Sequence, residues 1–228
     1  MEKKINGNDI YYLQVIGDRI IINDNYEGIL IFDYKINLLR KIKIYEGMCI
    51  YSSFIIGENE LILFCPEDNN VVYVDIEKSE VKIMEVENDI LSSIIFNGMD
   101  KCVFHTNRNK YIIFDKKKKE LKKVNSNNEF NENMKENQIS KIENRILKMH
   151  EACNNEDYKD DVSVITYEDK IIIYNNGNAI EQYPREGYIF NNAKIMQIYE
   201  NLYLVVLCNK KNDEDISILS VKKINSIS

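Results

Sequence analysis

The chain has 228 residues, of which 44% are hydrophobic and 29% charged, and its formal net charge is −7. This is a globular composition, and its acidic balance argues against a nucleic-acid partner, because binding phosphates needs a basic surface. No apolar run approaches the roughly 18 to 20 residues that span a bilayer, and the polar N-terminus lacks the apolar core of a signal peptide. We therefore expect a cytoplasmic protein that binds neither nucleic acid nor membrane.

The cysteine pattern favours the same compartment. The cysteines number five, which is odd, and no two are spaced as Cys-x-x-Cys. Cys65, Cys102 and Cys208 fall within strand-like runs, where a free thiol acts as a small buried hydrophobe. A reducing cytoplasm is therefore the simplest interpretation.

One pattern recurs along the chain: a short apolar run that ends in a side chain able to accept a hydrogen bond from the next turn. The copies are Gly28–Asp33, Val71–Asp75, Tyr111–Asp115 and, with asparagine in place of aspartate, Ile171–Asn175. The first three copies are about 40 residues apart, which is the period that four strands per unit would produce.

Turn-forming residues divide each of the first three repeats into four strands. The predicted strands are 10–16, 19–23, 28–32 and 38–44, then 50–56, 60–65, 71–74 and 81–86, then 90–96, 101–106, 110–114 and 120–124. The first strands also align with one another, and their starts read Asp9-Ile-Tyr-Tyr, Ile50-Tyr-Ser-Ser, Ile90-Leu-Ser-Ser and Ile189-Phe-Asn-Asn. Agreement at two positions of the unit is stronger evidence for a repeat than one recurring run.

The fourth unit is interrupted. Residues 125–137 are too rich in Asn and Glu to pack and are predicted to be a polar insertion, after which strands resume at 162–166, 170–174 and 179–183. Gln138–Asn155 has two interpretations. Either Arg145–His150 forms the first strand of the unit, or the apolar residues from Ile139 to Met149 line one face of a helix. We favour the strand, because the unit otherwise lacks one.

The fifth unit has three predicted strands, 189–198, 202–208 and 216–221, and lacks a fourth. The N-terminal segment 1–6 is the remaining candidate, and donating it to the last unit would cover an open edge and close a ring. We therefore predict an all-β fold, a single five-bladed β-propeller domain of four-stranded antiparallel blades spanning 1–228. The predicted blades are 9–45, 46–87, 88–125, 138–184 and 187–222, with 1–6 as the closing strand.

The chain resembles the β-propeller class of repeat proteins over roughly its whole length. It has no tryptophan, none of the Gly-His and Trp-Asp pairs of WD repeats, and none of the double glycines of Kelch repeats. The resemblance is therefore to the five-bladed class and to no particular family. A four-bladed ring with an appendage and a β-sandwich are the alternatives, and neither explains the period as well.

In propellers the first strands line a central channel, so their aligned polar side chains would gather at one end of it. These residues are Tyr12, Ser52, Ser53, Ser92, Ser93, Asn191 and Asn192. Their hydroxyls and amides are suited to binding a small polar ligand. They also suit a structural role, because small polar residues fit where strands converge and water can satisfy them. We favour the structural role.

No motif indicates catalysis, a cofactor or a metal. Five-bladed propellers include glycoside hydrolases, which need two facing carboxylates, whereas the channel positions here hold Tyr, Ser and Asn. His105 and His150 are the only histidines, and neither has a second ligand at metal-site spacing. Nucleophile-elbow, P-loop and Rossmann patterns are absent. We therefore predict no catalytic residue, no metal and no cofactor.

The stretch Asn154–Asp161 is acidic, but it lacks the glycine and the closing glutamate of an EF-hand, so we interpret it as a solvated surface loop. A basic partner would be attracted to such a loop, and tyrosines beside turns suit a protein-binding surface because they are large, rigid and amphipathic. The residues expected to contact a partner are Tyr26, Glu156, Asp157, Tyr158, Asp160 and Asp161.

These features indicate a non-enzymatic module that binds a basic protein partner. A more specific hypothesis is an immunity or antitoxin-like inhibitor, since inhibitors of basic toxins are commonly small and acidic, and charge complementarity speeds capture. The alternative is a small-ligand-binding protein or a carbohydrate-active enzyme that uses the channel mouth. A third possibility is a sensor or scaffold domain that works within a larger assembly.

Overall fold

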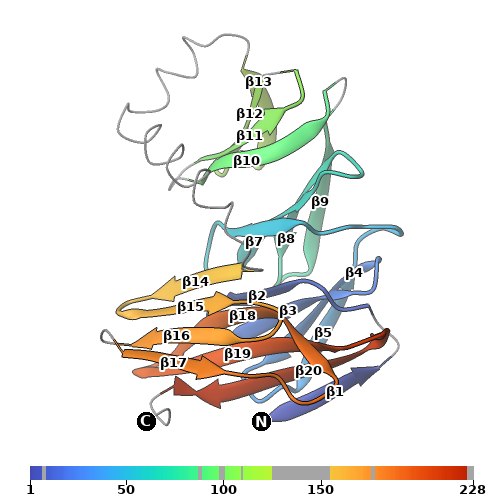
Figure 1. Cartoon of the computed structure of the whole chain (residues 1–228). Helices are drawn as coiled ribbons and strands as arrows, with labels where there is room; N and C mark the ends of the chain where they lie inside the picture. The colour runs from blue at the N-terminus through green and yellow to red at the C-terminus, as the bar shows by residue number, and fades with distance from the viewer. Residues whose placement is uncertain are drawn as a thin grey trace. The chain divides into compact units, whose positions relative to one another are not determined.

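The computed structural model of the chain describes residues 1–6, 9–86, 89–97, 101–108, 110–124, 155–175 and 178–224. The regular elements within these residues are twenty β-strands, which form five four-stranded antiparallel sheets (Figure 1). We number the sheets I to V in chain order, and we leave the N-terminal strand out of the numbering because it joins the last sheet. The predicted all-β class and the predicted four-stranded antiparallel units are thus confirmed.

Sheets I to III follow the predicted strands closely. Sheet I comprises β2 (Leu13–Ile16), β3 (Arg19–Asp24), β4 (Gly28–Asp33) and β5 (Leu38–Lys43). Sheet II comprises β6 (Ser52–Ile55), β7 (Glu60–Cys65), β8 (Asn70–Asp75) and β9 (Glu80–Glu85). Sheet III comprises β10 (Leu91–Asn97), β11 (Lys101–Thr106), β12 (Tyr111–Asp115) and β13 (Glu120–Val124).

Sheet IV corrects one prediction. It comprises β14 (Asn155–Lys159), β15 (Val162–Thr166), β16 (Ile171–Asn175) and β17 (Asn178–Gln182). The prediction that Arg145–His150 supplies the first strand of this sheet is therefore wrong, because the acidic stretch interpreted as a loop forms that strand instead. Every residue of β14 pairs with β15 across a two-residue turn, in which Asp160 has a φ of 52°.

The reason lies in the position of β14 at the edge of its sheet. An edge strand needs only one set of ladder partners, so it can carry polar side chains that a central strand cannot. Residues 125–154 lie outside the described residues. The polar insertion at 125–137 and the helix alternative for Gln138–Asn155 therefore stay predictions.

Sheet V contains both the earliest and the latest strand of the chain. Its members are β18 (Tyr188–Ile198), β19 (Asn201–Lys210), β20 (Asp213–Lys223) and β1 (Glu2–Asn6). β1 pairs antiparallel with β20, from Glu2 opposite Ser220 to Asn6 opposite Ile216. The predicted donation of the N-terminal segment to the last unit is confirmed.

The chain divides into two compact units. The first consists of Met1–Met48 and Ala152–Ser228 and holds sheets I, IV and V, and the second is Cys49–Glu151 with sheets II and III. Closure of the five sheets into a single ring, and hence the single-domain propeller, stays a prediction.

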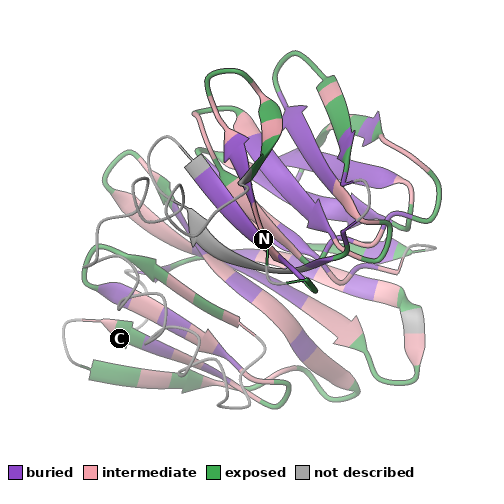
Figure 2. Cartoon of the chain, turned by 90° about the horizontal axis from the view of Figure 1, so that it is seen from above, coloured by how far each residue is buried: buried purple, intermediate pink, exposed green. Residues whose placement is uncertain are grey.

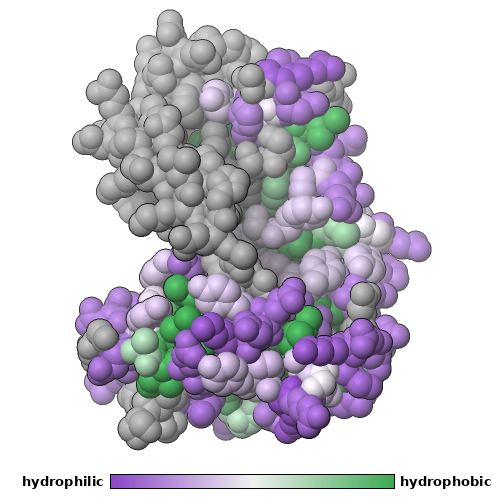
Figure 3. Space-filling view, viewed as in Figure 1, coloured by the Kyte–Doolittle hydropathy of each residue, from purple (hydrophilic) through white to green (hydrophobic). Residues whose placement is uncertain are grey.

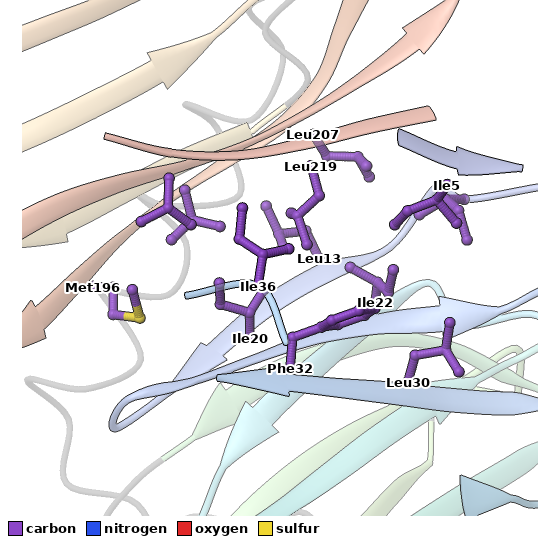
Figure 4. Packing of buried hydrophobic residues seen from close by; sticks show 13 residues of the cluster. Ile5, Leu13, Ile20, Ile22, Leu30, Phe32, Ile36, Met196, Leu207 and Leu219 are labelled. Carbon is purple, nitrogen blue, oxygen red and sulfur yellow. The ribbon is translucent and has the colours of Figure 1, made fainter. Parts of the chain in front are cut away.

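In the first unit, sheet V is the middle layer, because its central strand is apolar on both faces. Leu204 and Val206 of β19 pack against sheet IV, whereas Val205 and Leu207 pack against sheet I. This division follows from the two-residue period of a strand. Figure 4 shows the cluster between sheets V and I, where Ile5 of β1 joins the core.

The second unit has a core between sheets II and III. Phe64 of β7 stacks on Phe104 of β11 with ring centroids 5.8 Å apart. Cys102 is fully buried in this core, and burial raises its pKa to about 11, so the thiol stays protonated at neutral pH, as expected for an apolar filler. Figure 2 shows the general pattern, with buried residues on the strands and exposed residues at the turns.

The recurring aspartates perform the predicted role. Asp33, Asp75 and Asp115 each end the third strand of a sheet, and the Oδ1 atom of each accepts hydrogen bonds from backbone amides of the following turn. In Asp75, burial raises the pKa, but the hydrogen bonds from Lys78 and Glu77 outweigh that effect and hold the pKa below its ordinary value.

Asparagine side chains hold the segments that lead into first strands. Asn23, which is fully buried, accepts the backbone N–H groups of Tyr11 and Tyr12 on its Oδ1, at 3.0 and 2.9 Å. Its Nδ2 donates to the Asp9 carbonyl. One side chain thus satisfies three backbone groups of the segment 9–12, which have no strand partner.

Two further asparagines act from the preceding sheet. Asn69, at the β7–β8 turn, accepts the Leu91 N–H at 2.7 Å and donates to the Asp89 carbonyl at 2.7 Å, and so holds the chain that enters sheet III. Asn209, near the end of β19, donates to the Ile10 carbonyl at 2.8 Å. The chain that enters sheet I is therefore tied to sheet V in the way that sheet III is tied to sheet II.

Replacing Ile5 with alanine should lower the free energy of unfolding by about 2 to 3 kcal/mol, because it removes the apolar anchor of β1 from the core. Lys4→Ala, at an exposed position of the same strand, is the matched control and should cost less than about 0.5 kcal/mol. Urea denaturation measures both. Equal effects would mean that β1 is held by its backbone ladder alone.

Asp75→Asn should make the free energy of unfolding less dependent on pH. The folded-state pKa of Asp75 lies below the ordinary value of an aspartate, so the carboxylate stabilises the fold above about pH 4, and this stabilisation is lost as pH falls through the folded-state pKa. The difference between wild type and variant should therefore shrink from pH 6 to pH 2 in urea titrations. A constant difference would contradict this assignment.

Candidate functional site

The first strands of sheets IV, V and I are neighbours in the first unit, since β18 contacts both β14 and β2. Two side chains of β14 bond to the backbone of β18. Asn155 Nδ2 donates to the Ala193 carbonyl at 2.9 Å, and the Ile195 N–H donates to Asp157 Oδ2 at 2.7 Å. These bonds satisfy backbone groups on the free edge of sheet V and fix β14 alongside β18.

A lysine reaches both of these β14 side chains. Lys194 Nζ is 3.4 Å from Asn155 Oδ1 and 3.8 Å from Asp157 Oδ1, and the side chain is 14% exposed. Burial lowers the pKa of Lys194, against the attraction of Asp157, which raises it. The result is an amine that loses its proton more readily than a surface lysine, held where two sheets meet.

An open groove of about 320 Å³ runs beside this cluster. It is lined by the three neighbouring first strands and the turns that follow β2 and β18, through Val15, Gly17, Lys159, Ile195, Gln197 and Tyr199. The lining combines apolar side chains with an amine, an amide and a phenol. These groups suit a small polar ligand, which is the chemistry expected of a channel mouth.

The predicted channel residues fall in both units. Tyr12 is buried ahead of β2, and the half-buried Asn191 and Asn192 lie at a bulge of β18, all in the first unit. Ser52 and Ser53 begin β6 in the second unit and are half-buried. Ser92 and Ser93 belong to β10 of the same unit, with side chains outside the described residues. Their convergence on one channel stays a prediction.

Sequence reasoning missed Asn155 and Lys194. The available signal was the lysine itself, which interrupts the otherwise apolar and amide-rich run 189–198. Its partners could not be found from the sequence, because the sequence predicts the first strand of sheet IV at 145–150 and not at β14. The contact depends on which strand is the neighbour of β18.

A second arrangement of functional side chains lies on sheet IV. Val162, Val164, Ile171 and Ile173 face sheet V, so the alternate residues of each strand face the other way. We call this second surface the outer face of sheet IV. It is formed by Glu156, Tyr158, Ser163, Ile165, Ile172, Tyr174, Ala179 and Glu181.

One row across this face is acidic at both ends and apolar between them. Glu156 on β14 is opposite Ile165 on β15. Ile172 on β16 continues the row, and Glu181 on β17 ends it. Both glutamates are exposed and both isoleucines are half-buried. Figure 3, in the view of Figure 1, shows hydrophobic residues among hydrophilic ones over the strands of this sheet.

Each glutamate is held by a tyrosine two residues further along the chain. Tyr158 donates its hydroxyl to Glu156 at 2.6 Å and is 60% exposed, and Tyr183, which is 67% exposed, donates to Glu181 at 2.6 Å. Lys170 also bonds to Glu181, at 2.9 Å. The Tyr183 hydroxyl first, and then Lys170, lower the pKa of Glu181, so this carboxylate stays charged.

The predicted partner-binding residues separate into three groups. Glu156 and Tyr158 lie on the outer face of sheet IV, and the exposed Asp160 and Asp161 form the β14–β15 turn beside it. Asp157 points the other way, toward β18. Tyr26 lies apart from both, in the β3–β4 turn, where its hydroxyl donates to Asp9 and its ring stacks on Tyr11 at 5.8 Å.

The second unit has its own cluster of titratable groups. Lys119 Nζ lies 3.0 Å from a Glu60 carboxylate oxygen and 4.2 Å from the ring centroid of Tyr73, and it donates to the Tyr73 hydroxyl. Burial, followed by the hydrogen bond to Glu60, raises the pKa of Tyr73 to about 12. Such a phenol is not a base at neutral pH, so this network acts as a polar link between sheets II and III.

Among the residues that the structure describes, no three His, Cys, Asp or Glu side chains gather into a group that could hold a metal ion. No helix in the same part of the chain is long and apolar enough to cross a membrane. The ring of His105 lies against Tyr111, with centroids 5.5 Å apart, and His150 is outside the described residues.

No protein-family model matches the sequence, and no curated protein matches it. Solved structures are similar at low identity. Virginiamycin B lyase from Staphylococcus aureus is 10% identical, with a TM-score of 0.45, over 98% of this chain and 73% of that one. The C-terminal WD40 domain of Sif2 is 11% identical, with a TM-score of 0.43, over 94% of this chain and 58% of that one.

The N-terminal domain of Nup159 is 10% identical, with a TM-score of 0.38, over 97% of this chain and 63% of that one. The chain thus spans 58 to 73% of the length of these three structures. The sheets themselves carry the resemblance to the β-propeller class, through five four-stranded antiparallel units and a last unit completed by β1.

Asp157→Asn should lower the pKa of Lys194 further, because it removes the negative charge that favours the protonated amine. The 13C shift of the Lys194 side chain, followed by NMR across alkaline pH in selectively labelled protein, measures this pKa. Asp160→Asn, an exposed aspartate in the adjoining turn, is the matched control. A Lys194 pKa that both variants leave unchanged would rule out the Asp157 pairing.

Proposed function

We propose that this chain is a non-enzymatic protein-binding module, and more specifically an immunity or antitoxin-like inhibitor of a basic protein. The observation that carries the proposal is the outer face of sheet IV with its adjoining turn. There, exposed tyrosines and carboxylates gather around half-buried isoleucines.

This combination suits a protein interface. Tyrosines provide large contact areas at low entropic cost, and the aliphatic centre supplies area to be removed from water. Glu156 and Glu181 are already oriented by hydrogen bonds from Tyr158 and Tyr183, so little freedom is lost when they pair with a cation.

The charge of the chain supports a basic partner. A formal net charge of −7, with Asp160 and Asp161 at the edge of the same face, attracts a cationic protein from a distance and speeds association at low salt. Rapid capture is what an inhibitor of a toxic protein requires, which is why we favour an immunity-type role over a scaffold.

A second candidate is a small-ligand-binding protein or carbohydrate-active enzyme, for which the groove beside Lys194 is the supporting observation. It ranks below protein binding. Asp157, a carboxylate on one of the first strands that line this groove, is engaged by the Ile195 N–H, whereas glycoside hydrolysis needs two carboxylates facing the substrate.

The test is capture of a partner from native lysate by three tagged proteins: wild type, Glu156→Gln/Tyr158→Ala, and the matched control Glu67→Gln/Tyr51→Ala. Tyr51 is 62% exposed and donates to Glu67 at 2.6 Å, so the control removes an equivalent pair from another sheet. We expect a basic protein that wild type and control retain at low salt and release as salt rises. The sheet IV variant should capture at least fivefold less.

Equal capture by all three proteins would contradict the proposed surface. Capture that is insensitive to salt would contradict the basic character of the partner. If no protein is captured while a small ligand shifts the NMR signals of the groove residues Gln197 and Tyr199, the second candidate replaces the first.

A further inference from the structure

The occupant of the outer face of sheet IV can be specified from its dimensions, on the premise of the proposed protein-binding function. The carboxylates of one row stand on β14 and β17, which are separated by three interstrand spacings. At about 4.8 Å each, the spacings place the backbones of these two strands about 14 Å apart. Between them lie the two isoleucines, on β15 and β16.

An α-helix fits this width. With its side chains it is about 10 to 12 Å across, so a helix lying along the strands over Ile165 and Ile172 would have one carboxylate at each flank. An extended segment added to the edge of the sheet would contact only one of the two. A loop would contact the row, but its irregular shape does not match two carboxylates placed on either side of an apolar centre. The spacing of the carboxylates therefore favours a helix over both.

The length of the face agrees with its width. Each strand of sheet IV is five residues long, which corresponds to about 17 Å. A helix of that length has about three turns, or about 11 residues. Tyr174, which is 38% exposed on β16, extends the apolar centre along the same direction.

The chemistry of the flanks sets the charge of the helix. Lysine or arginine on both sides of an apolar stripe would pair with Glu156 and Glu181, and the rings of Tyr158 and Tyr183 beside them offer cation–π contacts. We propose that the outer face of sheet IV binds an amphipathic helix of a partner protein whose apolar stripe is flanked on both sides by basic residues.

The experiment uses synthetic peptides of about 18 residues, since shorter isolated helices are marginal in water. The first has leucines at helical spacing with lysines on both flanks. The second has the same composition in strict apolar–polar alternation, and the third is the helical pattern with glutamate in place of lysine. Calorimetry with the full chain measures binding. We expect the first peptide to bind at least tenfold more tightly than either control.

Protein variants locate the site. Glu156→Gln/Glu181→Gln should weaken binding of the first peptide about tenfold. The matched control is Glu27→Gln/Glu67→Gln, because Glu27 pairs with a lysine as Glu181 does, and Glu67 accepts a tyrosine hydroxyl as Glu156 does. The affinity of this control variant for the first peptide should stay within twofold of the affinity of wild type. Equal loss in both double variants, or equal binding of the alternating peptide, would overturn the proposal.

Other occupants are outcomes of the same measurements. Ile142→Asp/Ile146→Asp changes two apolar residues of the helix predicted as an alternative for Gln138–Asn155. If this change strengthens peptide binding tenfold, that segment competes for the face, so the occupant is the chain itself and the partner helix is overturned. If ultracentrifugation detects a wild-type dimer that Ile172→Asp dissociates, the occupant is a second copy.

Failure of this inference is distinguishable from failure of the proposed function. Partner capture that depends on sheet IV, combined with no preference for the helical peptide, removes the helix and keeps the function. Capture that does not depend on sheet IV, combined with no peptide binding, removes both.

Discussion

The structure depends on satisfying the backbone where the chain passes from one sheet to the next. These segments have no ladder partners, and asparagine side chains provide hydrogen bonds to them. Asn23 does so within sheet I, Asn69 acts across to the segment entering sheet III, and Asn209 acts across to the segment entering sheet I. Because each of these asparagines also fixes the segment just before a first strand, it helps to determine which strands lie next to that strand. In the first unit, Asn209 holds the segment that enters β2 beside sheet V, and Asn155 holds β14 beside β18. The Lys194 cluster and the groove lie along these three neighbouring first strands.

Much of the fold could be predicted because its signals are local. An aspartate after an apolar run, as at Asp33, Asp75 and Asp115, marks the same turn wherever it recurs, and the structure places a turn-capping carboxylate at each. The role of β1 followed from counting, since the fifth unit lacked one strand and only one segment was left. β14 could not be predicted in this way. Its strand character comes from pairing with β15, and its own residues are those of a loop.

The candidate sites depend on register, which explains why the sequence revealed only parts of them. Glu156 and Tyr158 were recognisable as exposed and interactive, but Glu181 belongs to the same face only because β17 pairs with β16 in one particular alignment. A shift of one residue would move its side chain to the buried side. Lys194 illustrates the same limit, since its partners lie 37 and 39 residues away on a strand with no apolar signal.

The pairing of β1 with β20 also bears on biosynthesis. The Met1 amine bonds to the carbonyl of Val221, across a sequence separation of 220 residues. At translation rates of about 5 to 20 residues per second, β1 waits roughly 10 to 40 s on the ribosome before its partner strand exists. Sheets built from consecutive strands can form in that interval, whereas sheet V cannot. The newborn chain therefore carries a short unpaired strand rich in lysine, a residue that discourages pairing with the wrong edge.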